Sequence, residues 1–140
     1  MTIHLNIGSN SGRRRAQIER ALAALRDALP GRMVTSDYIE TEPWGFESAN
    51  KFLNIGVMIV TERDYAPLEV LEITQGIERS ICPAPHRDAT GAYIDREIDI
   101  DIIAMDDIVS TDPRIILPHP RAHLRDFVMI PLLQCIMHNA

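Results

Sequence analysis

Acidic residues alternate with isoleucine between Arg96 and Ile103, in the run Arg-Glu-Ile-Asp-Ile-Asp-Ile-Ile. Successive side chains of a β-strand point to opposite faces of a sheet, so this pattern predicts a strand. The isoleucines would enter a core, while Glu97, Asp99 and Asp101 would share the opposite face. This strand limits the fold more than any other segment, because it needs both a core on one side and an open surface on the other.

The two aspartates also suggest a chemistry. Neighbouring side chains on one face of a strand have Cα atoms roughly 7 Å apart, so Asp99 and Asp101 repel each other unless water or a cation lies between them. Mg²⁺ is usually held by one or two carboxylates together with substrate phosphates. The alternative is an ordinary solvated acidic face, which is the simpler interpretation of this segment on its own.

Composition restricts the class of protein. The 140 residues are enough for one domain with a core, and we expect a single domain over residues 1–140. The net charge of -6 argues against nucleic acid or an anionic membrane as the partner. Arginines nevertheless cluster at 13–15, and Arg121 and Arg125 lie near the end, which suits a small anionic ligand.

The rest of the composition predicts a cytoplasmic protein. Cys82 and Cys135 have neither metal-ligand spacing nor the pattern of a disulfide framework, which fits a reducing compartment. We see no signal peptide pattern before the first strand, and the apolar runs are too short to span a membrane.

Hydrophobic periodicity predicts the order of the elements. Helical spacing follows the first strand from Ser11 or Gly12, and Pro67 suits the first turn of a second helix. The expected strands are residues 3–7, 33–41, 52–61 and 96–103, with short strands at 108–109 and 115–117 and a closing helix at 127–137. This β-α-β-β-α-β order predicts an α+β, ferredoxin-like sandwich with a C-terminal strand and helix extension.

Four ordered segments carry a family resemblance. They are Ile7-Gly8-Ser9-Asn10, then Thr41-Glu42-Pro43-Trp44-Gly45 before Phe52-Leu53-Asn54, then Arg96-Glu97-Ile98-Asp99-Ile100-Asp101, and finally Pro118-His119 followed by Arg125-Asp126-Phe127. Together they resemble the 6-hydroxymethyl-7,8-dihydropterin pyrophosphokinases of folate biosynthesis. The resemblance implies transfer of the terminal diphosphate of ATP to the hydroxymethyl group of a reduced pterin, with release of AMP.

The resemblance also implies roles at the phosphate end of a site. Asp99 and Asp101 match paired aspartates that hold two Mg²⁺ ions on the ATP phosphates. Arg96, His119 and Arg125 match residues that contact those phosphates. A second group matches or replaces nucleotide-binding positions: Gln75, Glu78, Arg87 and Tyr93. For Gln75 and Glu78, a solvated helix face is the alternative.

The pterin would bind between aromatic side chains. Phe52 and Phe127 match the two positions that sandwich the ring, and flat aromatic faces suit that stacking. Asn54 matches the residue that reads the hydrogen-bonding edge of the pterin, where an amide offers both a donor and an acceptor. Backbone groups of Thr41, Pro43 and Gly45 would contact the same ligand, and Gly8 would pack nearby.

The sequence departs from the family pattern after Glu78, where the usual Gly-Arg-x-Arg segment is absent. Arg87 or Arg79 could take the place of the arginine that closes over ATP, and Tyr93 stands where the family has tryptophan. We expect a monomer with ATP and a reduced hydroxymethylpterin as its partners. The alternatives are a binding module without catalysis and a Mg²⁺-dependent kinase that makes ADP. The sequence has no Walker-type Gly-Lys-Ser/Thr loop, which argues against a P-loop enzyme.

Overall fold

The computed structural model describes residues 1–42, 50–82 and 97–139. The strands are β1 (Thr2–Ser9), β2 (Gly31–Thr35), β3 (Ile39–Thr41), β4 (Phe52–Thr61) and β5 (Asp99–Met105). The helices are α1 (Arg14–Ala28), α2 (Pro67–Ile81), the 3₁₀ turn η1 (Ala122–Leu124) and α3 (Asp126–Asn139). None of the described helices is long and apolar enough to cross a membrane.

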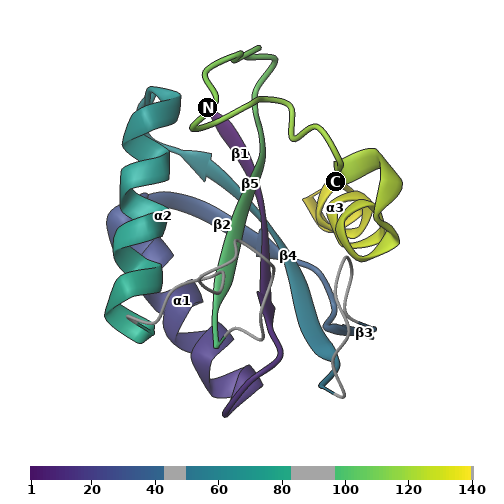
Figure 1. The fold of residues 1–140 in the computed structure, drawn as a ribbon. Coiled ribbons are helices and arrows are strands. Elements are labelled where there is room, and N and C mark those ends of the chain that lie inside the picture. The colour runs from purple at the N-terminus through teal and green to yellow at the C-terminus, as the bar shows by residue number, and fades with distance from the viewer. Residues whose placement is uncertain (43–49, 83–96, 140) are drawn as a thin grey trace.

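The strands form one antiparallel sheet in the order β2-β4-β1-β5, with β3 paired to β4. Helices α1 and α2 cover one face of this sheet, and α3 lies on the other face (Figure 1). The predicted β-α-β-β-α-β order holds when β2 and β3 are counted as the one strand expected before β4, and the C-terminal helix is confirmed.

The core lies between the sheet and the helix pair α1 and α2. Alternate residues of the central strands enter it, and Ile98, Ile100 and Ile102 do so as the alternating pattern predicts. A second, smaller cluster on the α3 side contains Ile103, Ala122 and Val128. Ile102 and Ile103 face different clusters because neighbouring residues of a strand point to opposite faces. The shift of register between β1 and β5 at His4/Leu5 lets Ile102 and Met105, which are three positions apart, both enter the main core.

Local chemistry explains where the two crossover helices begin. Helix α1 starts at Arg14, later than predicted, because Gly12 has a φ of 69° and therefore forms a turn. Helix α2 starts at Pro67, and the Ala66 N–H donates to Glu69 Oε1 at 2.9 Å. That bond satisfies a donor which the first turn of a helix leaves unpaired.

The predicted strand at 33–41 is wrong as a single element. It divides into β2 and β3 because Thr35 and Ile39 are four positions apart, whereas their partners on β4, Val57 and Asn54, are three positions apart. Ser36 fills the break: its N–H donates to Gly56 O at 3.0 Å, and its Oγ accepts the Gly56 N–H at 2.8 Å. The Asp37 N–H turns away to Gln134 Oε1 on α3.

The short strands predicted at 108–109 and 115–117 are also wrong. Within the described residues this segment forms one isolated bridge, between Ser110 and Leu117. The hydrogen bonds of the intervening loop are local, because Ile115 N–H donates to Asp112 O and Ser110 Oγ donates to Ile115 O. Too few backbone groups remain for a strand pair.

Candidate active site

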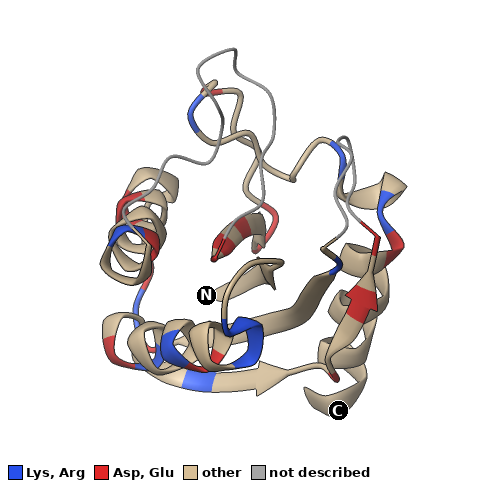
Figure 2. Ribbon diagram, turned by 60° about the horizontal axis from the view of Figure 1, so that its bottom comes forward, with Lys and Arg blue, Asp and Glu red and all other residues tan. Residues whose placement is uncertain are grey.

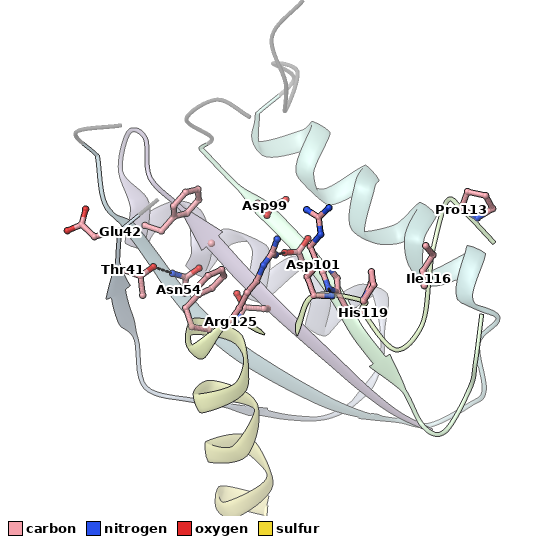
Figure 3. A pocket seen from close by; sticks show the side chains of 15 residues that line it. Thr41, Glu42, Asn54, Asp99, Asp101, Pro113, Ile116, His119 and Arg125 are labelled. Atoms are coloured by element: carbon pink, nitrogen blue, oxygen red, sulfur yellow. Dashed lines mark hydrogen bonds and ion pairs between the residues drawn. The ribbon is translucent and has the colours of Figure 1, made fainter. Parts of the chain in front are cut away.

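A cavity of about 500 Å³ opens on the α3 side of the sheet, opposite helices α1 and α2. Figure 3 shows Asn54 and Thr41 at one end of it, Asp99, Asp101 and Arg125 in the middle, and Ile116 and Pro113 at the other end. The lining residues are Asn6, Gly8, Thr41, Glu42, Phe52, Asn54, Asp99, Asp101, Pro113, Ile116, His119, Pro120, Arg121, Arg125 and Phe127.

The central strand β1 forms the floor of the cavity. Gly8 lies between Asn54 on β4 and Asp99 on β5 in the register of the sheet. Two residues earlier, Asn6 lies beside Asp101 in the same way. Residues two apart on a strand share a face, so this register brings the aspartates and the amide of Asn54 to the same surface.

One end of the cavity is built from an amide and two aromatic rings. Asn54 is 2% exposed, and its Nδ2 donates to Thr41 Oγ1 at 3.0 Å. A Cβ atom on Gly8 would lie 2.8 Å from Asn54 Oδ1 and 3.3 Å from the Phe52 ring. The absence of a side chain at Gly8 therefore makes the space in which Asn54 and Phe52 sit, and Phe127 lines the same cavity from α3.

The middle of the cavity combines carboxylates with a guanidinium group. Arg125 Nη1 lies 4.0 Å from Asp101 Oδ2, and the Arg125 side chain is 11% exposed. Between the two aspartates, the Ile100 N–H donates to Glu78 Oε2 at 2.7 Å. Since β5 lies at the edge of the sheet, this bond satisfies a backbone donor and ties the aspartate-bearing segment to α2. The acidic residues of β5 are drawn in red in Figure 2.

His119 is oriented by two backbone contacts. Its own N–H donates to Ile103 O at 2.8 Å, and its Nδ1 accepts the Arg121 N–H at 3.2 Å. Burial lowers the pKa of His119, the Arg125 and Arg121 charges lower it too, and the Asp99 carboxylate raises it. Because Nδ1 is an acceptor, a neutral imidazole carries its proton on Nε2 and can donate it to an anion.

The donor set of the cavity fits a metal ion that brings other ligands with it. Within the described residues, no group of three or more histidine, cysteine, aspartate or glutamate side chains is placed to hold a metal. Asp99 and Asp101 supply two carboxylates on one strand face. Mg²⁺ takes its remaining ligands from water and substrate phosphates, so a pair of carboxylates suits Mg²⁺. A structural zinc site, in contrast, needs four protein ligands.

The structure brings many of the predicted site residues together. Those that line the cavity are Gly8, Thr41, Phe52, Asn54, Asp99, Asp101, His119, Arg125 and Phe127. Those that lie outside the described residues are Pro43, Gly45, Arg87, Tyr93 and Arg96. Gln75 and Glu78 do not line it: Gln75 is exposed on α2, whereas Glu78 is 7% exposed, so the solvated-face alternative is wrong for Glu78. Their contact with a nucleotide stays a prediction.

Two charged residues that the sequence pointed to, Arg14 and Glu97, have their partners outside the cavity. Arg14 pairs with Glu40 at 2.9 Å and donates to the Lys51 carbonyl. Glu97 accepts a hydrogen bond from Gln17 on α1, so it does not join the aspartates in the cavity.

Several lining residues were missed by the sequence analysis. They are Asn6, Glu42, Pro113, Ile116 and Pro120. Asn6 could have been found, because it precedes Gly8 by two positions on the same strand face. Pro113 and Ile116 reach the cavity through a loop whose conformation has no periodic pattern in the sequence.

Comparisons with known proteins agree on one family. The profile described as 7,8-dihydro-6-hydroxymethylpterin-pyrophosphokinase matches residues 4–137. A 2-amino-4-hydroxy-6-hydroxymethyldihydropteridine pyrophosphokinase of Porphyromonas gingivalis is 42% identical over 132 residues, which cover 93% of this chain and 87% of that protein. A protein of the same description from Bacillus subtilis is 35% identical, with 94% of this chain and 75% of that protein covered.

Solved structures agree on the fold. Plasmodium falciparum HPPK-DHPS, wild type with SDX-DHP, superposes with a TM-score of 0.67 at 15% identity. The match covers 96% of this chain and 40% of that chain. At this identity the likeness shows the fold alone, and it confirms the ferredoxin-like prediction.

Proposed function

The chain belongs to the 7,8-dihydro-6-hydroxymethylpterin-pyrophosphokinase family, and from that membership we infer that it transfers the terminal diphosphate of ATP to 6-hydroxymethyl-7,8-dihydropterin in folate biosynthesis. The hydroxymethyl oxygen attacks the β-phosphorus and forms the new P–O bond. The bond from that phosphorus to the oxygen bridging to the α-phosphate breaks, AMP leaves, and the hydroxyl proton is released.

One observation carries this proposal: a single cavity holds both kinds of binding surface that the reaction needs. Its amide and aromatic end suits a flat heterocycle, and its middle holds carboxylates, a guanidinium group and an imidazole. Both surfaces face the same cavity of about 500 Å³. That arrangement would hold the hydroxymethyl oxygen near the phosphorus it attacks, which is the main contribution proteins make to phosphoryl transfer.

At the pterin end, we propose that Asn54 reads the edge of the ring. Its Nδ2 already donates one hydrogen bond to Thr41 Oγ1, which holds the amide in one orientation. The remaining donor and acceptor would pair with the amino-pyrimidinone edge of the pterin. We propose that Phe52 and Phe127 stack on the two faces of the ring, and that Gly8, Pro43 and Gly45 complete the pocket.

At the phosphate end, Arg125 and His119 would bind the transferred diphosphate. Arg125 offers a planar set of donors that matches phosphate oxygens, and its burial strengthens each of those contacts. His119 would donate through Nε2, since its Nδ1 is occupied by the Arg121 N–H. Arg96, Arg87, Tyr93 and Gln75 are proposed to contact the rest of the nucleotide, and Glu78 to hold β5 in place.

We propose two Mg²⁺ ions as the metal cofactor, held by Asp99 and Asp101 with the ATP phosphates. When bound there, Mg²⁺ neutralises charge on the phosphate oxygens and helps to orient them for in-line attack. The two aspartates would hold the metal-binding carboxylates at fixed positions, because both lie on one strand. Arg125, which lies beside Asp101, would neutralise part of the negative charge of the phosphates.

We further propose that residues 1–140 act as a single domain, as a monomer, in the cytoplasm. One feature supports the compartment: Cys82 and Cys135 are free thiols, which suit a reducing environment.

The identity of the nucleotide product, AMP or ADP, tests this function. The protein is incubated with ATP, Mg²⁺ and 6-hydroxymethyl-7,8-dihydropterin, and AMP is separated from ADP. We expect AMP that depends on the pterin and disappears when EDTA is added. ADP would indicate a different kinase, and pterin binding without turnover would indicate a binding module.

A further inference from the structure

A proline inside α3 leaves one backbone carbonyl without its usual partner. In an α-helix the N–H of each residue donates to the carbonyl four residues earlier, and proline has no N–H. Pro131 therefore cannot satisfy the carbonyl of Phe127. That carbonyl instead accepts a hydrogen bond from Asn6 Nδ2 at 2.9 Å.

The donor comes from the floor of the active site. Asn6 is 4% exposed, lines the cavity and lies beside Asp101 in the register of β1 and β5. A buried side-chain amide that reaches 121 positions along the chain fixes the start of α3 against the sheet. It does so at Phe127, whose ring lines the same cavity.

A second contact, between Gly56 and Pro131, holds α3 one turn further along. A Cβ atom on Gly56 would lie 2.7 Å from Pro131 Cβ, so the helix and β4 are in direct contact there. The lack of a side chain at Gly56 thus lets α3 approach the sheet, and the proline at 131 frees the carbonyl that Asn6 binds.

We propose that Asn6 is a positioning residue for the reaction: by satisfying the carbonyl that Pro131 leaves free, it orients Phe127 over the pterin relative to Asp101. This inference rests on the proposed function, because the pterin is the ligand of the Phe127 ring. Loss of a merely structural hydrogen bond would lower stability and would affect KM for the pterin and KM for ATP to the same extent.

The test is a double-mutant cycle on Asn6→Ala and Pro131→Ala. Alanine at 131 restores the N–H that can reach the Phe127 carbonyl, and it keeps a Cβ against Gly56. Leaving a buried carbonyl unsatisfied corresponds to roughly a tenfold loss of binding. We expect Asn6→Ala to raise KM for the pterin about tenfold and KM for ATP less than twofold. In the Pro131→Ala background, the same change should raise KM for the pterin less than about threefold.

Two further variants separate positioning from packing and from general destabilisation. Asn6→Leu keeps the branched shape of the side chain without its donor, and it should raise KM for the pterin as Asn6→Ala does. Ser36→Ala removes another buried hydrogen bond, to Gly56, outside the cavity. It should lower stability and leave KM for the pterin within twofold.

Denaturant unfolding of the same variants tests the Asn6 contact without any activity. If the unaltered protein forms no pterin-dependent AMP, the proposed function is refuted. The double-mutant cycle measured by unfolding would still report the coupling between Asn6 and Pro131. Equal effects of Asn6→Ala in both backgrounds, in KM and in the unfolding equilibrium, would overturn the positioning role. Equal rises in KM for ATP and for the pterin would overturn it as well.

Discussion

A methyl group at Gly8 would test how tightly the pterin end of the cavity is built. The backbone at Gly8 does not have a positive φ, unlike Gly12 and Gly31, so alanine can adopt its conformation. The effect of Gly8→Ala is therefore steric. The new Cβ would lie 2.8 Å from Asn54 Oδ1, closer than Cβ atoms approach oxygen in folded proteins, and 3.3 Å from the Phe52 ring.

The structure sets the size of this effect. Asn54 has to shift to relieve the overlap, and the Phe52 ring has to give by a few tenths of an ångström. Thr41 Oγ1 resists the shift of Asn54, because it accepts a hydrogen bond from the other end of the amide at 3.0 Å. Overpacking of this kind costs about 1–3 kcal/mol, and weakening one neutral hydrogen bond costs about 1 kcal/mol. If about 1–2 kcal/mol of that falls on pterin binding, KM for the pterin rises roughly 5- to 30-fold. KM for ATP should change less than twofold.

The assay is pterin-dependent AMP formation, with each substrate varied at a saturating concentration of the other. Gly76→Ala is the matched control, because a Cβ at Gly76 meets no atom closer than Arg79 Nη2, at 3.9 Å. Alanine inside a helix is more stable than glycine by about 0.5–1 kcal/mol, so this variant should unfold at a higher denaturant concentration. Its Michaelis constants should be unchanged. A Gly8→Ala protein with KM for the pterin within twofold of the parent would refute the steric argument.

Four other substitutions test the rest of the site and its surroundings. Asp99→Asn and Asp101→Asn should each lower kcat on the order of a thousandfold, with the unfolding midpoint preserved, because each removes a metal ligand; activity in both variants equal to the parent would exclude the metal assignment. Phe127→Ala should weaken pterin binding more than ATP binding by calorimetry, and the reverse order would contradict stacking. Burial lowers the pKa of His4, and its Nδ1 has no hydrogen-bond partner among the described residues, so below about pH 6.5 the unfolded chain binds more protons than the folded one. The free energy of unfolding should therefore fall as the pH drops from 7 to 5, and His4→Leu should flatten that slope in urea titrations; an unchanged slope would exclude His4 as its source.

The features that the sequence predicted best depend on short-range periodicity. Alternation from Arg96 to Ile103 placed the isoleucines in the core and both aspartates at the cavity, because two residues per repeat is a property of the strand itself. The division of residues 33–41 into β2 and β3 was missed for the opposite reason. The groups that interrupt the strand are Gly56 and Gln134, which lie 20 and 97 positions from Ser36 and Asp37.

The role proposed for Asn6 shows the same limit more sharply. By itself, an asparagine inside a strand predicts only local hydrogen bonding, and a proline in an apolar helix predicts only a distorted boundary. The two become one feature only when α3 is docked on the sheet, since the carbonyl freed by Pro131 then meets the amide of Asn6. Strand β1 can supply that amide because its residues on this face line the bottom of the cavity. Gly8 leaves space for the ligand, and Asn6 binds the start of α3. A bulkier β1 would fill the cavity, and an apolar one would leave the Phe127 carbonyl unpaired. The segment Asn6-Ile7-Gly8 thus meets two demands at once, with Ile7 buried in the core beneath it.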